Sequence, residues 1–242
     1  MELMLFSNST VKGRGYLEHA ADVLAEYLGS ARTLLFVPFA GADHEAYTAL
    51  VADALRPYDV EVTGLHAAED PLEAIERADL VFTGGGNTFR LVKELHERGL
   101  MGPLSRAVRS GTQYMGSSAG TNIAAPSLRT TNDMPIVQPP SFETLGLVPF
   151  QINPHYLDAD PTSTHAGETR ADRIREFHEE NSLSVLGLRE GTYLRVISDD
   201  GGTTSAWIGG DAVGTPAPGP AVLFRRGSGP EEVCGDVSSL FR

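Results

Sequence analysis

The sequence has a single cysteine and a deficit of basic residues. One cysteine, Cys234, cannot form an intrachain disulfide or a metal site built from several cysteines. Nineteen Lys and Arg stand against 32 Asp and Glu, for a formal net charge of −13. Because nucleic acids and anionic membranes are bound mainly through Lys and Arg, this balance argues against both as partners.

Long apolar segments are also missing. No run approaches the roughly 20 apolar residues that cross a bilayer. Residues 1–10 lack the basic region and apolar stretch of a secretion signal. We therefore expect a cytoplasmic protein. Its 242 residues, 41% of them hydrophobic and 21% charged, are enough for a sizeable core, and the simplest division is a single domain over residues 1–242.

Strand-like and helix-like segments alternate through the first half. Short apolar runs predict strands over residues 2–7, 33–39, 60–65, 79–82 and 113–115. Apolar residues at three- and four-residue spacing predict helices over residues 17–28, 47–55, 71–77, 88–97 and 104–109. Such alternation is typical of parallel strands joined by right-handed crossovers. The fold class is therefore α/β, with a mostly parallel, doubly wound sheet and helices on both faces.

The second half has a different pattern. Residues 130–145 are rich in Pro, Asn and Thr and predict a long loop, and a helix is expected near residues 171–180. Strands are predicted over residues 146–152, 185–188, 193–197, 206–208 and 221–224. Their close spacing favours antiparallel C-terminal strands at the edge of the sheet.

The segment Gly116-Ser-Ser-Ala-Gly120 carries the strongest chemical signal. It has the Gly-x-Ser-x-Gly pattern, with a strand before it and a helix-compatible stretch after it. In a nucleophile elbow, the serine occupies a sharp strand-to-helix turn that small neighbours permit. Ser118 stands at that position, and the N–H of Ala119 would face a developing oxyanion. A tight turn that merely uses glycines is the alternative.

A second glycine-rich turn, Gly84-Gly-Gly-Asn87, follows the preceding strand. It lacks the spacing of a dinucleotide site and the Gly-Lys-Ser/Thr ending of a P-loop. Ligands bind at the carboxyl ends of parallel strands, where both glycine turns are expected to lie. We therefore favour a second oxyanion donor, Gly85 or Gly86, over a phosphate site.

A serine nucleophile needs a base and a carboxylate to orient that base. Of seven histidines, His155 is distinguished because it follows a predicted strand, whereas His165 lies in a polar loop and could contact substrate. His178 falls in a predicted helix among charged neighbours, where exposure to solvent is expected. Asp133 and Glu190 are both candidates for the carboxylate, and spacing alone does not choose between them.

Five blocks, in this order and over most of the chain, resemble the peptidase E (α-aspartyl dipeptidase) family. They are Thr83-Gly-Gly-Gly-Asn-Thr88, Gly116-Ser-Ser-Ala-Gly120, Thr131-Asn-Asp-Met-Pro-Ile136, Ile152-Asn-Pro-His155 and His165-Ala-Gly-Glu-Thr-Arg170. The resemblance implies a serine exopeptidase that releases N-terminal aspartate from small aspartyl peptides and needs no metal or cofactor. It also implies a flavodoxin-like fold similar to the class I glutamine amidotransferases.

The resemblance assigns roles to individual residues. Ser118 would be the nucleophile and His155 the general base. Glu190 would orient the base, and Asp133 would act in the pocket, on the substrate amino group. Gly86 and Ala119 would form the oxyanion hole. Candidate substrate contacts are Arg170, Asn87 and His165.

Two features qualify the resemblance. Ser117 stands where members of the family often have a large aromatic residue, which could widen the pocket. A chain of net charge −13 also repels acidic ligands at long range, so aspartate specificity demands a local cation. Arg170 meets that need because a guanidinium can bind a carboxylate with two parallel hydrogen bonds.

Two other functions fit the same motifs. A cyanophycinase-like hydrolase of β-aspartyl peptides would use the same elbow and histidine, although the Gly167-Glu-Thr-Arg170 block favours peptidase E. A non-catalytic small-molecule sensor on the same scaffold would not need Ser118 and His155 together. The sequence leaves open whether the protein is a monomer or a homodimer.

Overall fold

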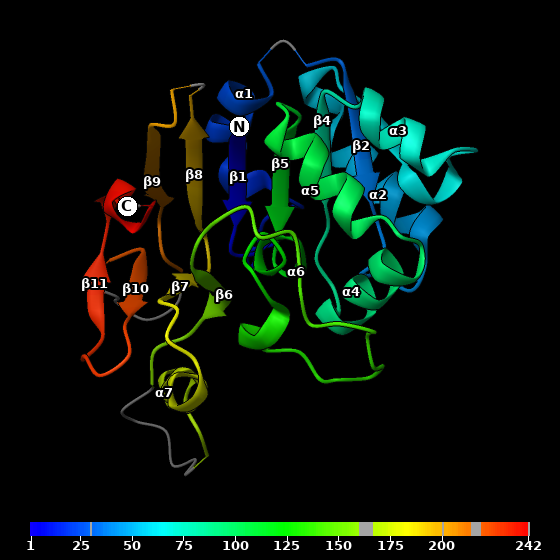
Figure 1. The fold of residues 1–242 in the computed structure, drawn as a ribbon. Helices are drawn as coiled ribbons and strands as arrows, with labels where there is room; N and C mark the ends of the chain where they lie inside the picture. The colour runs from blue at the N-terminus through cyan, green and yellow to red at the C-terminus, as the bar shows by residue number, and fades with distance from the viewer. Residues whose placement is uncertain (30, 160–166, 200, 214–218, 242) are drawn as a thin grey trace.

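The structure is a computed structural model that describes the chain except residues 30, 160–166, 200, 214–218 and 242. Its described residues form two sheets (Figure 1). The larger has eight strands in the order β12-β9-β8-β1-β5-β4-β2-β3. Their bounds are β1 Glu2–Phe6, β2 Thr33–Val37, β3 Glu61–Gly64, β4 Leu80–Thr83, β5 Gln113–Ser117, β8 Thr192–Ser198, β9 Thr204–Gly210 and β12 Gly235–Asp236.

Helices cover both faces of this sheet, except α7, which packs against the smaller sheet. They are α1 Ala21–Leu28, α2 His44–Leu55, α3 Pro71–Arg77, α4 Thr88–Glu97, α5 Met101–Arg109, α6 Ala119–Asn122 and α7 Arg170–Glu180. Short 3₁₀ helices lie at Glu18–Ala20, Arg56–Tyr58, Leu65–Ala67, Leu128–Thr130 and Ser238–Phe241. Within the described ranges, none of the helices is long and apolar enough to span a membrane.

The two faces follow from the alternation of side chains along β1. Leu3 and Leu5 point to the face covered by α3, α4 and α5, and belong to one buried apolar cluster. Met4 and Phe6 point to the other face and pack in a second cluster with residues of α1 and α2. Strands β1 to β5 pair in parallel, whereas β8, β9 and β12 continue the sheet in antiparallel pairing. The predicted α/β class is confirmed.

The smaller sheet was not predicted as a separate unit. It has the order β11-β10-β7-β6 in the described residues, with bounds β6 Gln151–Tyr156, β7 Val185–Arg189, β10 Ala221–Phe224 and β11 Glu231–Val233. The prediction of antiparallel strands is wrong for β6 and β7, which pair in parallel. Ile152 and Leu188 of this sheet share the larger sheet's apolar cluster, and the single domain over residues 1–242 stays a prediction.

Most predicted elements lie close to their expected positions, although helices α2 and α5 each begin three residues before their predicted starts. Helix α2 begins at His44, three residues before the predicted start, because the Asp43 side chain accepts a hydrogen bond from the Ala46 N–H and caps the helix. The strand predicted over residues 146–152 is wrong. Strand β6 begins at Gln151 and runs to Tyr156, so His155 lies inside a strand rather than after one.

The turn from β5 into α6 requires glycine at two positions. A Cβ on Gly116 would lie 2.8 Å from the Gly120 carbonyl, and a Cβ on Gly120 would overlap the Thr83 carbonyl oxygen of β4. Tyr114, buried in β5, donates a 2.7 Å hydrogen bond to the Gly120 carbonyl, and burial raises its pKa, which keeps the phenol protonated. The Gly-x-Ser-x-Gly pattern therefore reflects close backbone approach between β4, β5 and α6.

This packing predicts opposite effects for two glycine substitutions. Gly120→Ala should lower the free energy of unfolding by about 1–3 kcal/mol, because the added methyl group displaces the β4 backbone. Gly102→Ala, at an exposed position of α5, should instead raise it by up to about 1 kcal/mol, since its new Cβ meets only the flexible Arg106 side chain. Thermal unfolding of both variants measures the difference, and equal melting temperatures would contradict the packing argument.

Candidate active site

Ser118 occupies the sharp turn between β5 and α6. Its φ of 52° and ψ of −108° are unusual for a residue with a side chain. The Ser118 N–H donates a 3.2 Å hydrogen bond to the Phe6 carbonyl at the end of β1, and its side chain is half-buried. The strand–turn–helix context expected around Ser118 is present. Ser117, by contrast, is fully buried, and its effect on the width of the pocket stays a prediction.

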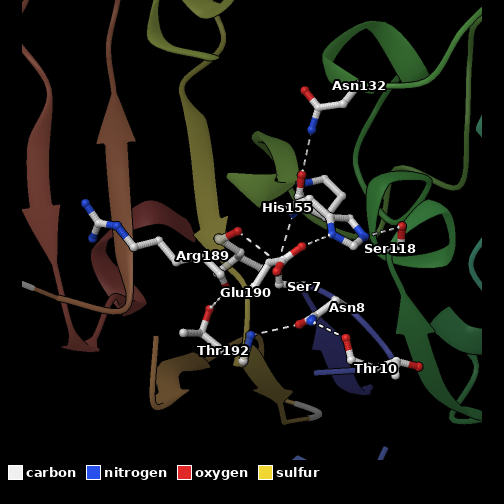
Figure 2. Close-up of polar contacts among 12 residues, drawn as sticks. Ser7, Asn8, Thr10, Ser118, Asn132, His155, Arg189, Glu190 and Thr192 are labelled. Carbon is white, nitrogen blue, oxygen red and sulfur yellow. Dashed lines mark hydrogen bonds and ion pairs between the residues drawn. The ribbon is translucent and has the colours of Figure 1, made fainter. Parts of the chain in front are cut away.

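His155 lies beside Ser118 although the two residues come from different sheets (Figure 2). Its Nε2 is 2.9 Å from Ser118 Oγ. The backbone at His155 has φ 54° and interrupts the regular register of β6 with β7. This local distortion aims the imidazole out of the small sheet and toward the elbow.

Glu190 completes a chain of three side chains. It follows directly after β7, and its Oε1 is 2.7 Å from His155 Nδ1. The His155 and Glu190 side chains are each 36% exposed, so both are partly open to solvent. With Nδ1–H donating to the carboxylate, Nε2 is left to accept a hydrogen bond from the Ser118 hydroxyl. This arrangement can take a proton from Ser118 during nucleophilic attack.

Asp133 lies elsewhere and makes no hydrogen bond to His155. Its Oδ2 accepts hydrogen bonds from the Thr88 N–H at 2.7 Å, the Thr88 hydroxyl at 2.6 Å and the Thr131 hydroxyl at 3.2 Å. The carboxylate thus sits at the start of α4, beside the glycine turn. Of the two acidic candidates, Glu190 is the one in contact with the imidazole.

The oxyanion donors predicted from the sequence, Gly86 and Ala119, belong to the glycine turn and to the residue after Ser118. A Cβ on Gly85 would lie 3.0 Å from Ser118 Cβ, which shows how closely the glycine turn approaches the elbow. Gly86 has φ 135° and no room for a Cβ beside the Ala40 backbone. Helix α6 has only four residues, so any help to an oxyanion comes from the Ala119 N–H itself rather than from a helix dipole.

The three predicted substrate contacts have different surroundings. Arg170 is the first residue of α7, and its guanidinium makes no hydrogen bond or ion pair with another described residue. Burial lowers the pKa of Arg170, the Arg173 charge lowers it further, and the Asp133 carboxylate opposes both. Asn87 caps α4 through Oδ1 and donates from Nδ2 to the Met134 carbonyl at 2.9 Å. His165 lies outside the described residues.

Several polar side chains around His155 were not singled out from the sequence. Asn132 donates a 2.8 Å hydrogen bond to the Pro154 carbonyl, and Ser7 accepts one of 2.9 Å from the His155 N–H (Figure 2). In the sequence, these two residues could have been found because Ser7 ends a predicted strand and Asn132 precedes the candidate acid Asp133.

His178, expected on the surface, is instead buried, with Nε2 3.0 Å from the Leu183 carbonyl oxygen.

Arg189 anchors the strand end that carries Glu190. Its side chain is 4% exposed and makes bidentate contacts of 2.7–2.8 Å with Asp158 and Glu232. These hydrogen bonds outweigh burial and raise the pKa of Arg189. Because Asp158 follows β6 and Glu232 lies in β11, one buried cation ties three strands of the small sheet together.

The described residues contain no group of three or more His, Cys, Asp or Glu side chains placed to hold a metal ion. Cys234 is exposed and lies between β11 and β12, away from the Ser118 turn. Independence from metals and cofactors stays a prediction from the family resemblance.

Comparison with known proteins tests that resemblance. The sequence model of peptidase family S51 matches residues 3–203. "Peptidase E" of Streptomyces coelicolor is 57% identical over 242 residues, covering 99% of this chain and 95% of that protein. "Probable alpha-aspartyl dipeptidase" of Drosophila melanogaster is 53% identical, covering 80% of this chain and 82% of that protein.

Solved structures share the fold at low sequence identity. A crystal structure from Listeria monocytogenes covers 87% of this chain and 98% of that chain, at 20% identity and a TM-score of 0.64. A peptidase from an acI-B1 actinobacterium covers 96% of each chain, at 18% identity and a TM-score of 0.58. The fold is therefore an established one, and the sequence matches identify its family. This chain belongs to peptidase family S51.

Proposed function

We propose that this protein is a serine dipeptidase that hydrolyses small peptides with an N-terminal aspartate. The observation that carries the proposal is the hydrogen-bonded chain from Ser118 through His155 to Glu190. Relatives at 57% and 53% identity are named peptidase E and probable alpha-aspartyl dipeptidase, which supports the same substrate class.

The reaction follows from the roles proposed for these side chains. Ser118 Oγ attacks the aspartyl carbonyl carbon while His155 Nε2 accepts the hydroxyl proton. The carbonyl oxygen becomes an oxyanion that accepts hydrogen bonds from the Gly86 and Ala119 N–H groups. Collapse breaks the C–N bond, and the leaving amine takes the proton from the imidazolium. Glu190 stabilises the imidazolium and holds its orientation.

Water completes the cycle. His155 removes a proton from a water molecule, and the resulting hydroxide attacks the aspartyl ester on Ser118. Breakage of the ester C–O bond returns the proton to Ser118 Oγ and releases aspartate. No redox partner or metal is required for either half of this sequence.

The substrate's charges can be matched by two residues. Arg170 offers a guanidinium without a described partner, within electrostatic reach of Asp133. Asp133 uses Oδ2 for Thr88 and Thr131, and its Oδ1 makes no hydrogen bond to any described residue. We assign Arg170 to the aspartate side-chain carboxylate and Asp133 to the substrate ammonium group. We further propose that Asn87 and His165 contact the substrate. The protein is proposed to be cytoplasmic and either a monomer or a homodimer.

If Ser118 is the nucleophile, removal of its hydroxyl should strongly lower activity, whereas removal of the neighbouring Ser117 hydroxyl should not. Ser118→Ala should lower kcat/KM for an aspartyl p-nitroanilide by at least about 10³-fold, because no other group replaces the attacking oxygen. Ser117→Ala is the matched control, since its hydroxyl is buried and has no hydrogen-bond partner among the described residues. Equal rates for wild type and Ser118→Ala would reject the assignment.

The two acidic residues should affect different kinetic constants. Glu190→Gln should lower kcat by about 10²- to 10⁴-fold, because the imidazole loses its charged partner. Asp133→Asn should mainly raise KM, by about 10-fold, through loss of a charged contact to the substrate amine. Steady-state kinetics with aspartyl-leucine separates the two effects. A loss of kcat confined to Asp133→Asn would reverse the proposed roles.

Arg170 should determine the preference for aspartate over asparagine. Arg170→Gln should lower kcat/KM for aspartyl-leucine by about 10- to 100-fold, the value of one charged hydrogen-bond pair, and leave asparaginyl-leucine nearly unchanged. Arg173→Gln, three residues further along α7 and 51% exposed, serves as the control for a lost surface charge. The same fractional loss on both dipeptides would count against Arg170 as the aspartate ligand.

A further inference from the structure

The two residues that face each other across the site share an unfavourable backbone conformation. Ser118 has φ 52° and His155 has φ 54°, in the range that favours glycine. Such conformations cost about 1–3 kcal/mol and persist only where the surroundings hold them. In both residues the backbone N–H is held by the end of β1, through the Phe6 carbonyl for Ser118 and the Ser7 hydroxyl for His155.

Ser7 connects three segments of the chain through one fully buried side chain. Its hydroxyl donates a 2.9 Å hydrogen bond to the Leu188 carbonyl of β7 and accepts the His155 N–H of β6 at 2.9 Å. A serine hydroxyl has one donor and two acceptor positions, so both bonds can form together. The Ser7 N–H donates to the Thr192 carbonyl at 2.9 Å. Ser7 therefore contacts the chain on both sides of Glu190.

Asn8 holds the residue directly after Glu190. Its Oδ1 accepts the Gly191 N–H at 2.8 Å, and its Nδ2 donates to the Thr10 carbonyl at 2.9 Å. Asn8 is 1% exposed, so water does not replace these bonds. Figure 2 shows Ser7 and Asn8 on the opposite side of Glu190 and His155 from Asn132.

We propose that Ser7 and Asn8 are positioning residues that keep His155 and Glu190 aligned with Ser118. Neither side chain touches the reacting oxygen, and both act through the backbone of the residues they hold. The inference rests on the proposed function for the roles of Ser118, His155 and Glu190. It adds that the end of β1, through Phe6, Ser7 and Asn8, fixes the relative placement of all three.

Kinetics of Ser7→Ala and Asn8→Ala test the proposal with aspartyl-leucine as the substrate. Each variant should lower kcat about 10- to 100-fold, the loss expected for a displacement near 1 Å, with KM changed less than about twofold. Ser105→Ala is the matched control, because it removes a hydroxyl that donates a single 2.7 Å bond to the Leu145 carbonyl in another part of the fold. Its kcat should match wild type.

A double-mutant cycle separates positioning from general destabilisation. In the Glu190→Gln background, Ser7→Ala and Asn8→Ala should each lower kcat by less than about a further threefold. The reason is that His155 has already lost the charged partner with which Ser7 and Asn8 keep it aligned. The same fold loss in both backgrounds would overturn the proposal. Thermal unfolding shows which variants are folded at the assay temperature, and a folded variant of either residue is sufficient for the cycle.

A spectroscopic measurement does not depend on the peptidase assignment. The proton shared by His155 Nδ1 and Glu190 should give a far-downfield proton resonance, identified by its loss in Glu190→Gln. Ser7→Ala and Asn8→Ala should shift or broaden it, whereas Ser105→Ala should not. An unchanged resonance in both variants would overturn the positioning role. Inactivity of the wild type on aspartyl peptides would instead reject the proposed function and leave this result standing.

Discussion

The pairing of β1 between β5 and β8 is the constraint on which the site depends. Phe6, the last residue of β1, lies opposite Ser117 of β5 and Tyr193 of β8. The parallel pair with β5 delivers Ser118 to the end of the sheet, where its N–H meets the Phe6 carbonyl. The antiparallel pair with β8 places the segment that follows Glu190 beside the same end of β1. Directly after β1, Ser7 donates a hydrogen bond to Leu188, 181 positions further along the chain.

Strained backbone conformations and the hydrogen bonds that hold them are concentrated at this end of the sheet. Ser118 and His155 both adopt left-handed backbone conformations, and the glycines at positions 116 and 120 let β4, β5 and α6 approach without side-chain collision. Hydrogen bonds that involve Ser7, Asn8 and Asn132, together with the Arg189 ion pairs, hold the neighbouring backbone. A reactive geometry that is unfavourable locally is thus stabilised by contacts that involve no substrate.

Sequence reasoning succeeded where the signal is local. The helix bounds at residues 71–77 and 88–97, the alternation of apolar strands and the elbow at Ser118 all depend on neighbours within a few positions. The match to peptidase family S51 confirms the serine-type hydrolase expected from five short blocks. The strand at residues 146–152 and the antiparallel pairing of β6 failed because apolar runs specify neither where a strand begins nor which partner it takes.

By itself, the sequence determined the chemistry available to this protein: a serine in a glycine-flanked turn, one histidine at a strand, two acidic candidates and an excess of negative charge. Only the tertiary structure decided which acid meets the imidazole, since Glu190 and Asp133 are equally plausible in spacing yet lie in different hydrogen-bond networks. The position of Ser7 and Asn8 beside His155 and Glu190 is likewise visible only in the folded structure. The physical reason is that the partners of a side chain depend on which strand ends lie next to one another. The local spacing of apolar residues does not determine which distant strands pair.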